Sequence, residues 1–389
     1  MSNLEELIER LCHDGVEYKY LADVVTIKRG VRLIKKELKD NAKYPVYQNS
    51  LIPLGYYDDY NCEANKTMII TAGAAGDIVY SNTKFWAADD CFYFICNRYI
   101  DDKFLYYVLM SQQRGIYSKV RKASIPRLPR IVIEKIKLPV PPLEVQREIV
   151  RILDNFTFLT TELAAELAAR QKQYEYFRDL LLNDCNGTNG KIIDMLVQPI
   201  TDGPHTTPTL VSSGIPFVSA EAIFDGHVNF EKKRGFITEK FHLECCRKYK
   251  PQKNDVYLVK SGSTTGKVAY VYTDEEFNIW SPIAALRTNA DNSSRFLFHL
   301  LQSNKIQQQV KSKSSHGSQP NLSMRVLEQF DVVIPSLEKQ NQIANLLDRF
   351  DVLCNDISSG LPAEIEMRQK QYEYYRDKLL SFKELKKEA

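Results

Sequence analysis

The sequence predicts an α+β protein in which two similar globular domains alternate with two long helical spacers. Three observations predict it. The segment Arg-Gln-Lys-Gln-Tyr-Glu-Tyr occurs at residues 170–176 and again at residues 368–374. Before each copy, apolar residues recur in steps of three and four, as on one face of a helix. The regions between the helices contain short β-forming runs, and the second region is a diverged copy of the first.

Residues 1–141 form domain 1, which is predicted to be a mixed α/β unit. Short runs at 68–71 and 92–95 predict strands separated by turns, and apolar residues predict a helix near 103–113. Residues 142–184 form spacer 1, whose apolar positions predict a continuous helix over most of its length. Such a helix spans roughly 60 Å, a length that suits a spacer between two bodies.

Domain 2, residues 185–335, begins at a polar, glycine-rich boundary. Its segment 261–270 corresponds to the glycine-containing segment 72–80 of domain 1. Spacer 2, residues 336–389, repeats spacer 1. Pro362 is predicted to kink or interrupt this second helix, or to stand in the first turn of a helix that restarts there.

Composition predicts an intracellular, cytoplasmic protein. The formal net charge is only +3, so any basic surface must be local. The eight cysteines include no Cys-x-x-Cys pair, a usage that fits a reducing compartment. There is neither a signal-peptide pattern nor an apolar run of the length that a membrane helix needs.

The motifs predict no catalytic residue and no metal site. The segment 261–267 is one residue short of a phosphate-binding loop, and Val268 stands where a magnesium-binding Ser or Thr is needed. The prolines at 139–142 lack the polar and aromatic neighbours of an adenine methyltransferase loop. The six histidines show no metal-ligand spacing, and His299, in an apolar run, is expected to be packed.

The whole chain resembles the specificity subunit of a type I restriction–modification system. The resemblance rests on the Pro-Pro-Leu-Glu-x-Gln entry at 141–146, its degenerate copy at 335–340, the repeated exit motif and the alternation with two variable domains. It implies two pseudosymmetric target-recognition domains separated by two antiparallel helices, with each domain reading one half of a bipartite DNA target. It further implies two methyltransferase subunits and restriction subunits as partners. S-adenosylmethionine, ATP and magnesium would belong to those partners.

One detail of spacer 1 supports a role in setting the gap between half-sites. Residues 161–164 and 165–168 form a repeated tetrapeptide that resembles the Thr-Ala-Glu-Leu repeats of some family members. Each such unit lengthens a helix by about 6 Å. The alternative is that an alanine-rich repeat simply favours helix formation.

Basic segments at 119–130 and 311–321 lie at matching places in the two domains and are the principal candidates for DNA contact. Lys and Arg bind phosphates, and Arg, Asn and Gln can also pair with base edges. The alternative for these segments is an exposed charged loop. The glycine turns are candidates as well, because glycine lets backbone amides approach phosphate, although a tight turn between strands explains them equally. The candidate DNA-binding residues are Lys28, Arg29, Gly73, Lys119, Arg121, Lys122, Arg127, Arg130, Lys260, Ser261, Ser263, Thr264, Lys311, Lys313, Ser314, His316, Gln319 and Asn321.

The aromatic residues of the repeated exit motifs are too many for one helix seam. Some are expected to fill the helix pair, and the remainder to bind two copies of a methyltransferase subunit. The candidate partner-binding residues are Tyr174, Tyr176, Phe177, Tyr372, Tyr374 and Tyr375. The alternative to a specificity subunit is a stand-alone DNA-modifying enzyme, either an adenine methyltransferase or a nuclease. A coiled-coil scaffold leaves the two diverged domains unexplained.

Overall fold

The computed structural model describes residues 3–183, 185–315, 319–355 and 359–385. These residues form two compact units. Unit 1 comprises Met1–Leu163 and Ile365–Ala389, and unit 2 comprises Ala164–Glu364. Each unit therefore combines one domain with the adjoining parts of both spacers. Among the described residues, no helix is both long and apolar enough to cross a membrane.

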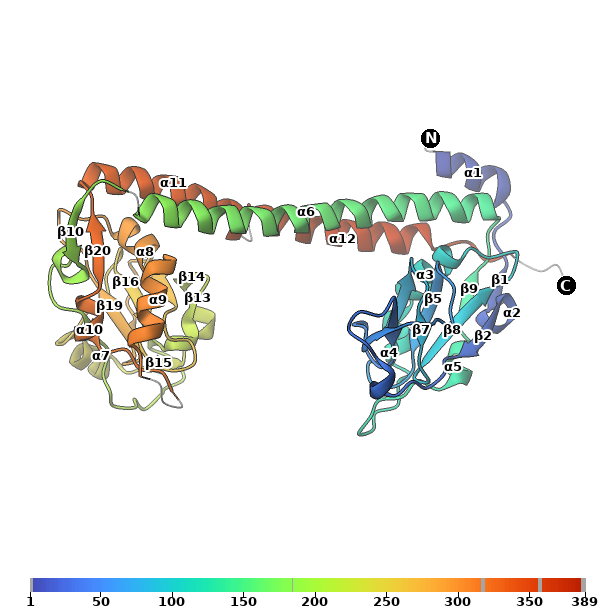
Figure 1. Cartoon of the computed structure of the whole chain (residues 1–389), viewed down its shortest axis with the longest axis horizontal. Helices are drawn as coiled ribbons and strands as arrows, with labels where there is room; N and C mark the ends of the chain where they lie inside the picture. The colour runs from blue at the N-terminus through green and yellow to red at the C-terminus, as the bar shows by residue number, and fades with distance from the viewer. Residues whose placement is uncertain (1–2, 184, 316–318, 356–358, 386–389) are drawn as a thin grey trace. The chain divides into compact units, whose positions relative to one another are not determined.

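Domain 1 is built around a four-stranded sheet of order β2-β8-β5-β6 (Figure 1). A three-stranded sheet, β4-β3-β7, and a two-stranded ribbon, β1-β9, complete the strands. The strands are β1 (Tyr18–Tyr20), β2 (Val25–Arg29), β3 (Tyr44–Tyr47), β4 (Gly55–Tyr57), β5 (Lys66–Ile70), β6 (Ile78–Ser81), β7 (Trp86–Ala87), β8 (Cys91–Cys96) and β9 (Lys137–Pro139). The helices are α1 (Asn3–Leu11), α2 (Leu21–Val24), α3 (Asp102–Ser111), α4 (Gln113–Tyr117) and α5 (Arg130–Glu134).

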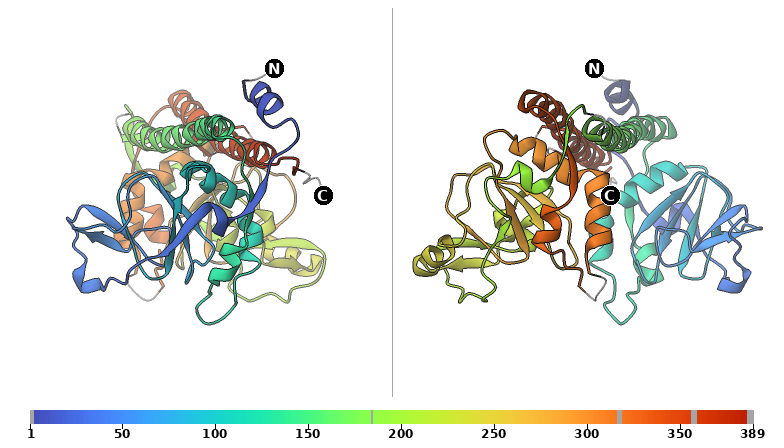
Figure 2. Two further views of the ribbon diagram at one scale, coloured as in Figure 1. Left: turned by 90° about the vertical axis from the view of Figure 1, so that its right-hand side faces the viewer. Right: turned by 60° about the vertical axis from the view of Figure 1, so that its left-hand side comes forward.

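Domain 2, coloured from green through yellow to orange in Figure 2, repeats this plan and adds to it. The sheet β11-β19-β16-β17 corresponds to the domain 1 sheet and is extended at one edge by β14 and β13. Its strands are β10 (Thr188–Lys191), β11 (Thr201–Asp202), β12 (Ile215–Val218), β13 (Ile223–Phe224), β14 (Gly226–Val228), β15 (Gly235–Ile237), β16 (Val256–Val259), β17 (Val268–Tyr270), β18 (Asn278–Ile279), β19 (Ile283–Leu286) and β20 (Asp331–Ile334). Its helices are α7 (Glu239–Cys246), α8 (Ser294–Gln302), α9 (Asn304–Lys313) and α10 (Met324–Glu328).

Spacer 1 is the single helix α6 (Leu143–Asn183), as its apolar periodicity predicts. Spacer 2 contains two helices, α11 (Leu337–Asn355) and α12 (Leu361–Leu379). Pro362 is the second residue of α12, where its missing N–H costs no helical hydrogen bond. The prediction of an interruption before Pro362 and a restart at it is confirmed.

Each core joins a domain to the spacer segments of its own unit. In unit 1, Val145, Ile149 and Leu153 of α6 are buried together with the apolar face of α3. In unit 2, Ile343 and Leu347 of α11 are buried against α8. Since these side chains lie four residues apart along their helices, each spacer uses one helix face to hold its domain.

Aromatic stacking joins the two spacers within each unit. In unit 1, Phe156 of α6 stacks on Tyr375 of α12, with 5.5 Å between ring centroids. In unit 2, Phe350 of α11 stacks on Phe177 of α6, with 6.0 Å between ring centroids. The stacks are related by the repeat, because Phe350 corresponds to Phe156 and Phe177 to Tyr375. Four of the six aromatic candidates therefore fill the helix pair, as part of the set was expected to do: Tyr174, Phe177, Tyr372 and Tyr375.

Candidate nucleic-acid interface

In domain 1, hydrogen bonds join the glycine turn, residues 71–77, to the basic loop, residues 119–130. The turn joins β5 to β6, and the Gly73 N–H donates to the Pro126 carbonyl over 3.2 Å. The Leu128 N–H donates to the Thr71 carbonyl over 2.8 Å. Gly73 has a φ of +79°, and a Cβ there would lie 2.9 Å from Asn49 atoms, so glycine is required by the turn itself.

Domain 2 has the same two hydrogen bonds at the corresponding residues. The Gly262 N–H donates to the Pro320 carbonyl over 3.0 Å, and the Leu322 N–H donates to the Lys260 carbonyl over 2.7 Å. Ser261 forms a β-bridge with Asn321, as Ala72 does with Arg127. The correspondence that the sequence indicated between these segments is thus confirmed in three dimensions. The amides of Gly73 and Gly262 are engaged within their domains, which supports the tight-turn explanation for both glycines, and contact of Gly73 with DNA stays a prediction.

Four of the predicted arginines of domain 1 line one cavity of about 480 Å³. They come from three segments: the end of β2, the basic loop and the start of α5. We call this cavity the arginine pocket and define it by Arg29, Arg121, Arg127 and Arg130. Thr71, Asp90 and Phe92 contribute to its wall. The sequence predicted each arginine separately, but not that β2 and α5 would bring them to the loop.

Internal contacts hold two of the four arginines, whereas the other two project from the loop. The Arg29 Nε donates to the Asp89 carbonyl over 2.8 Å. Arg130 pairs with Glu134 at 2.7 Å and lies over the Phe92 ring. Arg121 and Arg127 form a backbone bridge with each other, and their side chains are exposed without a carboxylate partner among the described residues. A polyanion or a base edge can therefore reach the latter two.

The lysine candidates of domain 1 lie outside this pocket. Lys28 on β2 and Lys122 in the loop are exposed. Lys119 lines a separate hollow of about 440 Å³ together with Lys135 and Lys137, which the sequence prediction did not include. Lys137 is paired with Glu384 at 2.6 Å. The ammonium groups of Lys28, Lys119, Lys122 and Lys135 are suited to phosphate contacts, because they are accessible point charges.

The domain 2 candidates form a less cationic surface. The Lys260 ammonium lies 3.3 Å from the buried carboxylate of Asp202, which also pairs with Lys248. Ser314 is buried, and its hydroxyl donates to the Val310 carbonyl over 2.6 Å, an arrangement that does not favour its predicted DNA contact. His316 lies outside the described residues. The remaining candidates line the turn, the end of α9 and the loop, and all are at least partly exposed: Ser261, Ser263, Thr264, Lys311, Lys313, Gln319 and Asn321.

Sequence reasoning missed a buried glutamine at the start of each spacer. Gln146 accepts from the Asp101 N–H over 2.8 Å and donates to the Pro141 carbonyl over 2.6 Å. Gln340 accepts from the Ser293 N–H over 2.8 Å and donates to the Pro335 carbonyl over 2.9 Å. Asp101 and Ser293 are the N-caps of α3 and α8, so each glutamine ties a domain helix to a spacer. The sequence signal that could have indicated these contacts is the occurrence of a glutamine at the same position of both repeats.

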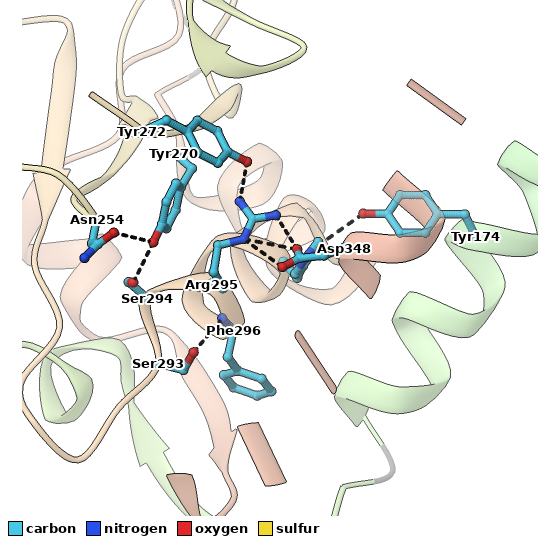
Figure 3. Close-up of polar contacts among 10 residues, drawn as sticks. Tyr174, Asn254, Tyr270, Tyr272, Ser293, Ser294, Arg295, Phe296 and Asp348 are labelled. Carbon is cyan, nitrogen blue, oxygen red and sulfur yellow. Dashed lines mark hydrogen bonds and ion pairs between the residues drawn. The ribbon is translucent and has the colours of Figure 1, made fainter. Parts of the chain in front are cut away.

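About two turns further along each spacer, an aspartate forms a second tie, also missed from the sequence. In domain 1, Asp154 of α6 pairs with Lys103 at 2.8 Å and accepts from the Tyr107 hydroxyl over 2.6 Å. We call this arrangement the Asp154 clamp. At the corresponding place in unit 2, Asp348 of α11 pairs with Arg295 (Figure 3). Asp348 also lies 2.6 Å from the His299 Nε2. This is the Asp348 clamp.

Burial fixes the protonation state of His299. Because Asp348 only accepts hydrogen bonds, Nε2 of the ring carries the proton and Nδ1 accepts from the Tyr174 hydroxyl over 3.2 Å. Burial lowers the pKa of His299 below its ordinary value of 6.5, outweighing the hydrogen bond to Asp348. Burial also raises the pKa of Asp348, but hydrogen bonds from His299 and Arg295 outweigh it and hold that pKa below 3.8. His299 is packed, as expected, and it is also a neutral hydrogen-bonding partner.

Two aromatic residues of the exit motifs stay accessible. Tyr176 is 64 % exposed and Tyr374 is 62 % exposed, and they occupy the same place in the two copies. Tyr174, in contrast, is 5 % exposed and bonded to His299, which leaves it unavailable to a partner. Tyr176 and Tyr374 are therefore the most accessible of the six predicted partner-binding residues, and that role stays a prediction.

Comparisons with known proteins agree with this duplicated arrangement. The family model of the type I restriction modification DNA specificity domain matches twice, at residues 13–170 and 205–367. A Haemophilus influenzae protein named as a type I restriction enzyme specificity subunit is 30% identical over 98% of this chain and all of its own length. A Mycoplasma pneumoniae type I specificity subunit is 29% identical over 94% of this chain and 98% of its own.

Solved structures share the fold. A type I restriction–modification S subunit from M. genitalium has a TM-score of 0.59 at 16% identity, covering 94% of this chain and 96% of its own. A chain from a structure of the assembly and conformational transition of the type I system has a TM-score of 0.62 at 15% identity, covering 94% of this chain and 97% of its own. The family match supports the interpretation as a non-catalytic DNA-recognition subunit and not the stand-alone enzyme. The chain belongs to the specificity subunits of type I restriction–modification enzymes.

Proposed function

We propose that domain 1 and domain 2 each bind one half of a bipartite DNA target, while the spacers set the gap between the halves. One observation carries this proposal: the fastened turn and loop occur in both domains, with different side chains around them. Arg127 in the loop of domain 1 is replaced by Asn321 in domain 2, although both form the same backbone bridge. Two equal frames with different donors and acceptors suit two different base sequences.

Two methyltransferase subunits are the proposed partners on the spacers, and restriction subunits join them. Tyr176 and Tyr374 support this part, because each is exposed at the same position of a repeated motif. Identical surfaces repeated on one chain suit two copies of one partner. S-adenosylmethionine would be bound by the methyltransferase subunits, and ATP and magnesium by the restriction subunits. We place the assembly in the cytoplasm, where its DNA is found.

The helix α6 is the proposed ruler of the gap. Its repeated tetrapeptides, 161–164 and 165–168, lie within an uninterrupted helix. One more unit adds about 6 Å, which is close to the rise of two base pairs. Inserting one unit is expected to lengthen the gap by one or two base pairs and to leave both half-sites intact. A motif with the original gap in the insertion variant would refute the ruler.

Modified adenines mapped across a genome by single-molecule sequencing test the proposal. The chain is expressed with its methyltransferase subunits, and the map is compared with one from cells lacking the chain. The expected result is a bipartite motif with a fixed gap that disappears when the chain is absent. An identical map in both cells, with the complex present by pull-down, would contradict the proposal.

A further inference from the structure

The two domains can be compared position by position around the arginine pocket, because their sheets share one register. In domain 1, Arg29 at the end of β2 is paired with Phe92 of β8. In domain 2, Asp202 at the end of β11 is paired with Ala284 of β19. A glycine follows each residue at a similarly close approach: a Cβ on Gly30 would lie 2.1 Å from the Ala88 oxygen, and one on Gly203 would lie 1.8 Å from the Ile279 oxygen. Asp202 therefore occupies the place of Arg29.

The other three arginines are also replaced in domain 2. The strand-like loop contact between Arg121 and Arg127 corresponds to that between Ser315 and Asn321, in which the Ser315 N–H donates to the Asn321 carbonyl over 3.0 Å. Arg130 opens α5, and Met324 opens the corresponding helix α10. Domain 2 thus has no arginine at any of the four positions.

Lys260 of domain 2, which has no counterpart lysine in domain 1, is paired with a carboxylate. Lys260 stands where domain 1 has Thr71, since the Leu322 and Leu128 amides donate to their respective carbonyls. Its ammonium pairs with Asp202, the residue that replaces Arg29. The difference between the domains is therefore a change in chemistry as well as in charge. Domain 1 has four guanidinium groups at positions where domain 2 has an aspartate, a serine, an asparagine and a methionine.

A guanidinium group has donors and no acceptor, so it binds phosphate oxygens or base acceptors on DNA, and the base edge that suits its bidentate geometry is the N7 and O6 of guanine. Asp90 favours the base over the phosphate as the partner. It lines the same pocket as the four arginines. Its counterpart in domain 2 is Pro282, because the Thr71 N–H donates to the Asp90 carbonyl and the Lys260 N–H donates to the Pro282 carbonyl. A carboxylate repels phosphate but accepts a hydrogen bond from the amino group of cytosine. Arginine beside aspartate thus complements the edge of a guanine–cytosine pair.

We propose that domain 1 reads a guanine–cytosine pair in its half-site through the arginine pocket, with Arg121 and Arg127 donating to guanine and Asp90 accepting from cytosine. Domain 2 reads its half-site without arginine at the corresponding positions. This inference rests on the proposed bipartite function. Arg29 and Arg130 are positioning residues here, because their guanidinium groups are held by Asp89 and Glu134.

The test maps modified adenines for the whole complex with wild-type chain, Arg127→Ala and Arg127→Lys. The wild-type motif should contain a guanine–cytosine pair in one half. Arg127→Ala should relax the motif at that pair at least tenfold and leave the other half unchanged. Arg127→Lys should not restore the lost discrimination, because lysine keeps the charge but lacks the bidentate geometry. Arg121→Ala serves as a second variant with the same expected result.

Two matched controls define the alternatives. Lys122→Ala removes one exposed charge from the same loop and should leave the motif intact. Asn321→Ala, at the position of Arg127 in domain 2, should leave the guanine-containing half intact. Uniform loss of methylation with an unchanged motif, restored by Arg127→Lys, would mean a phosphate contact and would overturn the inference while the proposed function stands. A wild-type map without any bipartite motif would overturn both.

Discussion

Domain 1 and domain 2 agree where they face the spacers and differ where their loops face outward. Gln146 and Gln340 make matching hydrogen bonds, and both side chains are completely buried. At the loops, in contrast, Arg127 becomes Asn321. The buried frame tolerates little change because an unpaired polar group there is costly, whereas an exposed side chain can vary freely. The fold thus separates the task of holding a domain from the task of reading DNA.

The largest expected effect comes from the entry glutamines. Gln340→Ala removes the partners of the Ser293 N–H and the Pro335 carbonyl, both close to the buried end of α8. We expect a loss of about 3 kcal/mol in unfolding free energy, and a similar loss for Gln146→Ala in domain 1.

The chain contains two tryptophans, Trp86 in domain 1 and Trp280 in domain 2. Denaturant unfolding followed by fluorescence therefore reports domain 2 alone in a Trp86→Phe background and domain 1 alone in a Trp280→Phe background. Gln342→Ala, at an exposed position on the same helix, should be neutral. Equal stability of Gln340→Ala and Gln342→Ala would show that the buried glutamine does not hold the domain.

The two clamps should differ in strength. Asp348→Ala leaves Arg295 and His299 without their carboxylate, and the Arg295 side chain is only 18% exposed. We expect a cost of about 2 kcal/mol. Asp154→Ala should cost about 1 kcal/mol, because the Lys103 side chain that it leaves is more accessible. The same single-tryptophan chains measure both losses of unfolding free energy. A greater loss for Asp154→Ala in domain 1 than for Asp348→Ala in domain 2 would contradict the expected difference between the clamps.

Only the Asp348 clamp should respond to mildly acidic pH. His299 is neutral in the folded domain, and its pKa lies below the ordinary value of 6.5, so the unfolded chain binds the proton more readily. The stabilisation that the neutral His299 gives domain 2 is therefore fully present above about pH 6.5. The free energy of unfolding falls as the pH drops below that value, by at most about 1.4 kcal/mol per pH unit. The lowered pKa of Asp348 keeps that group charged throughout this range.

The matching variant for this test is His299→Tyr, because domain 1 has Tyr107 at the corresponding position. In this variant, the loss of domain 2 stability that His299 causes at low pH should disappear. Unfolding of domain 2 is compared at pH 7.5 and 5.5 for both chains. An equal loss in the wild type and the variant would place the titrating group elsewhere.

The smallest effect on stability is expected for Tyr176→Ala combined with Tyr374→Ala, below about 0.5 kcal/mol, because both side chains are largely exposed. The same variant should weaken binding of the methyltransferase subunits in a titration, since it removes both copies of the proposed contact. Phe158→Ala is the control, as Phe158 is 61% exposed on α6 outside the repeated motif. Undiminished binding by the double variant would count against the proposed surface.

The sequence was informative about the spacers and the fastened loops because both features are repeated. The periodicity predicted α6, and the alignment of 126–128 with 320–322 predicted the matching loops. The pocket could not be predicted in the same way. Arg29 and Arg130 reach the loop only through the pairing of β2 with β8 and the start of α5, which no local pattern records. The replacement of Arg29 by Asp202 becomes visible only in the strand register.

The most direct measurement of the central claim is the methylation motif of a chain in which residues 18–141 replace residues 189–335. These segments begin at equivalent positions, Tyr18 of β1 and Asn189 of β10, and end at Pro141 and Pro335. Both domains of this chain are then domain 1. We expect a bipartite motif that contains the half-site of domain 1 twice and lacks that of domain 2. A motif that keeps the original second half would contradict it, because that half would then be read outside domain 2.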